Sequence, residues 1–162
     1  MVLADKLADR ERNLQKLHDS YMLEKDRVAK FLDEGMPYLE LNKICLHSYI
    51  TGKPIEEIAE MRKLYTWTRT FYLLGLTPES YAEGEKNYKA DRISRLFGLD
   101  RSMLMKYLHM GFASHQIKSA YFISMNTGKD ILELLESKTR AKKWGDIAEE
   151  MGLPREGCKK IL

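Results

Sequence analysis

The feature that most constrains this chain is a sequence pattern that occurs twice. Pairs of like residues that stand 76 positions apart are Gly35 with Gly111, Thr51-Gly52-Lys53 with Thr127-Gly128-Lys129, and Ile55 with Ile131. After one inserted residue, pairs that stand 77 positions apart are Trp67 with Trp144 and Gly75-Leu76 with Gly152-Leu153. Such agreement over about 60 residues indicates a duplication of one unit of roughly 70 residues. We expect the two copies near residues 14–81 and 90–158.

What the two copies keep is expected to serve the fold, and what differs between them is free to carry function. Both copies keep a tryptophan, Trp67 and Trp144. Because a buried indole contributes a large apolar area, we expect both tryptophans to be core anchors.

The spacing of apolar residues is helical along the chain. In residues 3–34 apolar side chains recur at intervals of three, four and seven, and Gly35 follows. No strand-like alternation or hairpin dipeptide occurs. The sequence predicts an all-α protein, with an N-terminal helix and the first repeat in 1–81, a linker in 82–89, and the second repeat in 90–162.

The composition is that of a globular protein. Of 162 residues, 44% are hydrophobic and 31% are charged, unlike disordered chains. No apolar run approaches the roughly 20 residues that span a bilayer, and the first residues lack the apolar centre of a signal peptide. The two cysteines, Cys45 and Cys158, are too few for a disulfide framework. We expect a cytoplasmic protein with buried thiols and no membrane association.

The sequence lacks the patterns of catalytic and metal sites. The histidines are His18, His47, His109 and His115, and no two stand at metal-ligand spacing on one helix. Cys45 and His47 are two positions apart, so a helix points them in different directions. The Thr-Gly-Lys triplets lack the preceding glycine of a phosphate-binding loop. We therefore expect no enzyme activity, no metal and no cofactor.

The net charge of the chain is concentrated near its C-terminus. Residues 137–162 hold seven basic and four acidic residues, so this segment carries the whole net charge of +3. A local basic excess is typical of a surface that contacts a polyanion.

Two segments read as helix, glycine turn, helix. In 144–162 the small, glycine and apolar positions are filled by Ile147, Ala148, Met151, Gly152, Leu153, Cys158 and Ile161. In 90–109 they are filled by Ile93, Ser94, Phe97, Gly98, Leu99, Leu104 and Tyr107. Each segment resembles the helix-turn-helix motif of bacterial DNA-binding domains over about 19 residues.

The resemblance implies DNA binding and a role in transcriptional regulation. It implies that a recognition helix over 155–162 enters the major groove. The implied DNA-binding residues are Arg155, Lys159 and Lys160 on this helix and Arg101 and Lys106 on the outer face of the other segment. The same sequence pattern also occurs where two helices of purely structural role are joined by a turn. Both interpretations, DNA binding and a structural helix pair, stay open.

A helical protein-protein interaction module is the alternative function. Tandem helical units stack into surfaces that bind peptides or proteins. The N-terminal helix partly follows a heptad, through Leu3, Leu7, Leu14, Leu17 and Tyr21, with Arg10 interrupting it. This helix is therefore a candidate surface for a homodimer or for a partner chain.

Overall fold

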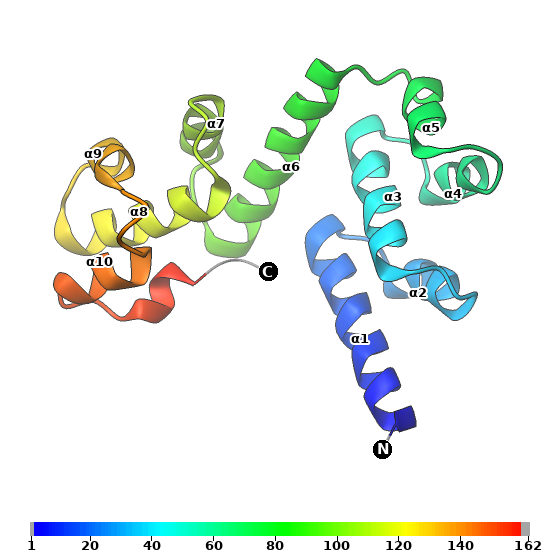
Figure 1. Cartoon of the computed structure of the whole chain (residues 1–162), viewed down its shortest axis with the longest axis horizontal. Coiled ribbons are helices and arrows are strands. Elements are labelled where there is room, and N and C mark those ends of the chain that lie inside the picture. The colour runs from blue at the N-terminus through cyan, green and yellow to red at the C-terminus, as the bar shows by residue number, and fades with distance from the viewer. Residues whose placement is uncertain (1, 160–162) are drawn as a thin grey trace. The chain divides into compact units, whose positions relative to one another are not determined.

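The predicted all-α class is confirmed. The computed structural model describes the backbone of residues 2–159 and the side chains of residues 4–159. This part of the chain contains ten α-helices, one 3-10 helix and no strand (Figure 1). None of the helices in this part combines the length and the apolar character that crossing a bilayer requires.

The chain divides into two compact units, residues 1–88 and residues 89–162, which we call unit 1 and unit 2. Unit 1 contains α1 (Val2–Tyr21), α2 (Lys25–Asp33), α3 (Tyr38–Thr51), α4 (Ile55–Leu64) and α5 (Trp67–Leu73). The boundary between the units falls within α6 (Pro78–Phe97). Unit 2 continues with α7 (Arg101–His109), α8 (Ser114–Thr127), α9 (Ile131–Ser137), α10 (Trp144–Glu150) and the 3-10 helix η1 (Arg155–Cys158).

The helix predicted over 3–34 is two helices, because the chain turns at Met22. The φ of Met22 is +58°, and its N–H donates to the carbonyl of His18 at 2.8 Å. Gly98 ends α6 in the same way, with a φ of +67° and an N–H that donates to Ser94 at 2.8 Å. Glycine adopts this left-handed conformation freely, whereas a residue with a Cβ is strained there by roughly 1–2 kcal/mol. Unit 1 therefore contains a strained turn where unit 2 has glycine.

Replacing Met22 with glycine should stabilise the protein. Met22 is 61% exposed, so Met22→Gly removes little packing. We expect the free energy of unfolding to rise by about 1 kcal/mol, measured by urea denaturation. Gly98→Ala is the matched control and should lower the free energy of unfolding by a similar amount. A Met22→Gly protein that is less stable than the parent would contradict this account of the turn.

Residues 82–89, predicted as a linker, lie inside α6. Gly84, in this stretch, marks a close approach between helices. A Cβ on Gly84 would lie 2.6 Å from Cγ2 of Ile50 on α3. The glycine therefore lets α6 pack against α3 within unit 1, and it does not mark a flexible segment.

The predicted dimer surface on α1 is largely used by the core of unit 1. Leu14 and Leu17 are buried in that core, where α1 packs against α2 and α3. Leu7 is 58% exposed, and the side chain of Leu3 lies outside the described residues. Dimerisation through α1 stays a prediction, but its apolar surface is smaller than the heptad pattern indicated.

Both tryptophans contribute to a core, as predicted. Trp144 is 7% exposed and belongs to the core of unit 2, while Trp67 is partly buried and packs against the core of unit 1. Cys45 is buried and Cys158 is half-buried, and neither forms a disulfide.

Candidate functional site

The positive charge of the protein lies on unit 2. This unit has fourteen basic and nine acidic residues, for a formal charge of +5, while unit 1 has thirteen basic and fifteen acidic residues, for −2. A polyanion would therefore be attracted to unit 2.

The predicted recognition helix over 155–162 is absent from the part that the structure describes. Residues Arg155–Cys158 form a single 3-10 turn, and Lys159 is extended. The turn is held against α8 at Gly157, where a Cβ would lie 2.3 Å from the ring of Phe122. Lys160, Ile161 and Leu162 lie outside the described residues.

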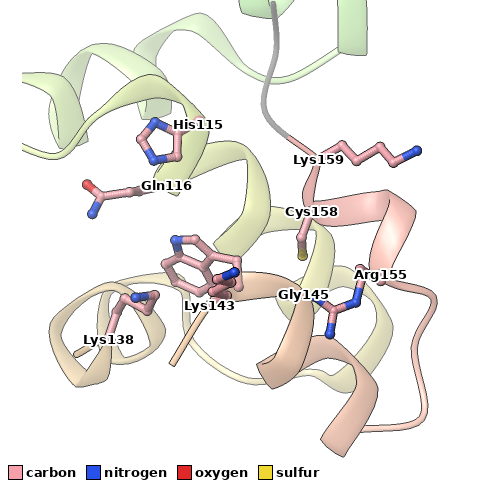
Figure 2. A pocket seen from close by; sticks show the side chains of 9 residues that line it. His115, Gln116, Lys138, Lys143, Gly145, Arg155, Cys158 and Lys159 are labelled. Carbon is pink, nitrogen blue, oxygen red and sulfur yellow. The ribbon is translucent and has the colours of Figure 1, made fainter. Parts of the chain in front are cut away.

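Arg155, the first predicted DNA-binding residue, is engaged in ion pairs with α10. Its Nε and Nη2 donate to the carboxylate of Glu149 at 2.9 Å, and Nη2 also donates to Asp146 at 2.5 Å. These hydrogen bonds raise the pKa of Arg155 and lower the pKa of both carboxyl groups. The side chain lies directly over Gly145, where a Cβ would come within 2.7 Å of its Cγ (Figure 2). Arg155 therefore fastens η1 to α10.

The other predicted DNA-binding residues that the structure describes lie in two places. Lys159 and Arg155 both line a cavity beside η1, whereas Lys160 is outside the described residues. Arg101 and Lys106 are on α7 and do not line that cavity. Nε of Arg101 pairs with Asp91 at 2.5 Å, and Nζ of Lys106 lies 5.3 Å from the ring centroid of Tyr107.

Residues 90–109 form two helices joined by a short turn. After α6 ends at Phe97, the turn over 98–100 leads into α7. Asp100 caps α7 by accepting a hydrogen bond from the N–H of Met103 at 2.8 Å. The predicted helix boundaries therefore occur here, and DNA binding by this pair stays a prediction.

A cavity of about 470 Å³ lies beside η1 in unit 2 (Figure 2). The residues that line it are His115, Gln116, Lys138, Lys143, Trp144, Gly145, Arg155, Cys158 and Lys159. None of these nine described residues is acidic, and four are basic. Lys138 and Lys143 lie on the side away from Arg155, and the Lys159 side chain extends outward (Figure 2).

Two of these lysines come from a basic loop, which we define as residues 138–143, between α9 and α10. The loop contains Lys138, Arg140, Lys142 and Lys143 and no acidic residue. Nζ of Lys142 pairs with Glu150 at 2.6 Å. The exposed side chains of Arg140 and Lys143 form no ion pair with any residue that the structure describes. Sequence reasoning counted these charges but did not select them, because they lie outside the helix-turn-helix pattern.

Trp144, in the wall of this cavity, has a buried indole N–H without an acceptor among the described residues. The carbonyl oxygen of Gln116, in the same lining, accepts from the N–H of Ala113 at 2.9 Å and does not accept a hydrogen bond from Trp144. Buried donors in folded proteins are nearly always paired. The indole N–H of Trp144 is therefore an unpaired donor in a residue of the cavity wall, and protein atoms cover it in this structure.

In unit 1 the indole N–H of Trp67 is paired. It donates to Oε2 of Glu40 at 2.9 Å, while Nε of Arg62 donates to Oε1 of the same carboxylate at 2.8 Å. The guanidinium carbon of Arg62 lies 4.5 Å from the indole centroid. Burial alone would raise the pKa of Glu40, but the hydrogen bonds from Trp67 and Arg62 hold it below its ordinary value. We call Glu40, Arg62 and Trp67 the tryptophan-carboxylate cluster.

Comparisons of the chain with models of protein families, with curated proteins and with solved structures find no match. Among the residues that the structure describes, no group of three or more His, Cys, Asp or Glu is placed to hold a metal ion.

Breaking the tryptophan-carboxylate cluster should destabilise unit 1. Glu40→Gln weakens two hydrogen bonds to a charged acceptor, and we expect the free energy of unfolding at pH 7 to fall by about 1–2 kcal/mol. Because folding lowers the pKa of Glu40, its contribution is present above about pH 4.3 and is lost as the pH falls through the folded-state pKa. The difference between parent and variant in urea denaturation should therefore shrink in acid.

The control for this variant is Glu57→Gln. Glu57 is 42% exposed and pairs with Lys53 one turn away, and exposed pairs of this kind contribute about 0.3–0.5 kcal/mol. Equal losses from Glu40→Gln and Glu57→Gln would show that the cluster has no special role.

Proposed function

We propose that the chain is a non-enzymatic, DNA-binding helical protein, and that the basic loop and Lys159 of unit 2 contact the phosphate backbone. One observation carries the proposal. The basic loop and the cavity beside it gather cationic side chains without a carboxylate among the lining residues, on the unit that carries a charge of +5. Phosphate contacts of this kind supply most of the sequence-independent affinity for nucleic acid.

The side chains that we propose as phosphate contacts are cations outside the salt bridges of the fold. Arg140, Lys143 and Lys159 are exposed and form no salt bridge with a described residue, although the charge of Lys143 helps to lower the pKa of Asp146. They can meet phosphates without breaking an existing contact. Arg155 and Arg101 would have to leave the carboxylates that they bind, and we assign both to the stability of the fold.

A role in transcriptional regulation is supported by the helix pair α6 and α7. Its helix-turn-helix-like sequence supports a regulatory role on DNA, with Lys106 on the exposed surface of α7 as a further phosphate contact. The free thiols of Cys45 and Cys158 support a reducing compartment, the cytoplasm.

A duplicated helical unit is also part of the proposal. The bounds of α2 and α7 differ by 76 residues at both ends, and the bounds of α3 and α8 do so as well. The tryptophans that begin α5 and α10 differ by 77. These offsets equal those of the sequence pattern, which supports two tandem copies of one unit.

Binding to random-sequence duplex DNA across a salt series tests the proposal. The logarithm of the affinity should fall with the logarithm of the salt concentration by about 0.9 per phosphate contact. The double variant Arg140→Ala/Lys143→Ala should weaken binding at low salt and reduce the slope by about 1.8. Fluorescence anisotropy of a labelled duplex measures both quantities.

Two variants serve as controls. Lys6→Ala/Lys30→Ala removes the same charge from exposed positions of unit 1 and should leave the slope unchanged. Arg12→Ala in unit 1 should also leave it unchanged, because that exposed guanidinium pairs with Asp9 and lies outside unit 2. Absence of binding at low salt, or equal effects of the two double variants, would exclude the basic loop as the contact surface.

Protein-protein interaction through unit 1 is the second candidate. Three large apolar side chains of this unit, Leu39, Leu64 and Tyr72, are 72–78% exposed. Exposed apolar groups are typical of interaction surfaces when they form a continuous patch. If the partner is a second copy, sedimentation equilibrium should show a concentration-dependent mass that Leu39→Glu/Leu64→Glu returns to that of a monomer. A monomeric parent at every concentration would remove self-association.

A further inference from the structure

The two units hold their tryptophans in corresponding places. Trp67 is the first residue of α5 and Trp144 is the first residue of α10. Glu40 and Gln116 are each the third residue of a 14-residue helix, α3 and α8. A basic residue also lies near each indole, Arg62 near Trp67 and Lys138 near Trp144. Glu40, Arg62 and Trp67 of unit 1 therefore correspond to Gln116, Lys138 and Trp144 of unit 2.

In unit 1 this arrangement is complete. Each oxygen of the Glu40 carboxylate accepts from one donor, Oε2 from the indole of Trp67 and Oε1 from Arg62. One planar group with two oxygens therefore satisfies an indole N–H and a cation together.

In unit 2 the donors are present and the carboxylate is missing. The indole N–H of Trp144 is buried and has no acceptor among the described residues. Nζ of Lys138 lies 6.0 Å from the indole centroid, and Lys143 lines the same cavity. Gln116 takes the place of the glutamate, and its carbonyl oxygen accepts from the N–H of Ala113 but forms no hydrogen bond with Trp144.

The cavity next to Trp144 has room for the missing group, which reaches the covered Nε1 atom when a side chain of the lining moves aside. Its volume is about 470 Å³, and its described lining contains no acidic side chain. In unit 1, by contrast, the carboxylate comes from the chain itself. An acceptor for Trp144 must therefore come from outside the described residues.

We propose that this cavity binds the carboxylate group of a ligand, with Trp144 as the hydrogen-bond donor and with Lys138 and Lys143 as counter-charges. The ligand is a small organic acid or the C-terminal carboxylate of a peptide. The proposal does not depend on DNA binding, because its evidence is the unpaired indole and the comparison with Glu40. It favours a carboxylate over a phosphate, because a carboxylate satisfies the corresponding donors in unit 1.

Titration with sodium acetate, followed in the ¹H–¹⁵N NMR spectrum, tests the proposal on the full chain. The two indole N–H resonances are assigned with a Trp67→Phe variant. Sodium chloride at matched ionic strength is the blank. We expect the Trp144 resonance to move in a saturable way with acetate while the Trp67 resonance stays in place.

A second series distinguishes the two sources of the carboxylate. An N-acetylated tripeptide with a free C-terminus is compared with acetate and with the same tripeptide carrying a C-terminal amide. Tighter binding of the free peptide than of acetate identifies a peptide C-terminus, and equal binding identifies a small acid. A shift of the same size with the amide would overturn the carboxylate proposal.

Three variants sharpen the test. Gln116→Glu supplies the carboxylate from within the chain, so the acetate-dependent shift of Trp144 should be lost. Lys143→Ala should raise the acetate concentration at half-saturation at least threefold, whereas Lys30→Ala in unit 1 should leave it unchanged. The proposal is overturned if Trp144 does not respond, if chloride moves it equally, or if inorganic phosphate binds as tightly as acetate. No nucleic acid is used, so these results do not depend on the outcome of the DNA experiment.

Discussion

A tryptophan buried at the start of a short helix must find an acceptor for its indole N–H, and the two units of this protein differ in whether they provide one. In unit 1, Glu40 provides it and draws Arg62 onto the same carboxylate. This contact ties α3 to α4 and α5. In unit 2, Trp144 is buried more fully than Trp67, but its N–H has no partner among the described residues. The apolar atoms of Trp144 are thus packed in the core, while its Nε1 atom lacks a hydrogen-bond acceptor.

The distribution of charge follows the same division. Unit 1 has a formal charge of −2 and uses its ion pairs to hold helices together, as in the pair of Arg27 with Glu56. Unit 2 has a charge of +5, and its basic loop adds positive side chains next to the cavity of Trp144. An anion would therefore be attracted to unit 2. The unpaired indole N–H of Trp144 is the hydrogen-bond donor that we propose for it there.

The helical class and most helix ends could be predicted from the sequence, because glycine and proline mark them locally. The turn at Met22 has no local signal, because methionine rarely adopts the left-handed conformation, and its only sign in the sequence is that the 76-residue offset sets Met22 opposite Gly98. Gly84 was misleading, because its close approach to Ile50 depends on tertiary packing. The role of Arg155 was hidden for a similar reason, as its carboxylate partners lie on another helix. The 76-residue offset already placed Gln116 opposite Glu40, but only coordinates show that Trp144 is left without an acceptor.

The most direct test of this account is a crystal structure of the protein grown in the presence of acetate. We predict electron density for a planar carboxylate within hydrogen-bond distance of the Trp144 Nε1 atom, with Lys138 or Lys143 as its counter-charge. The same structure should show Trp67 paired with Glu40. An indole of Trp144 that donates to a protein group, or a cavity that holds only water in saturating acetate, would contradict the account.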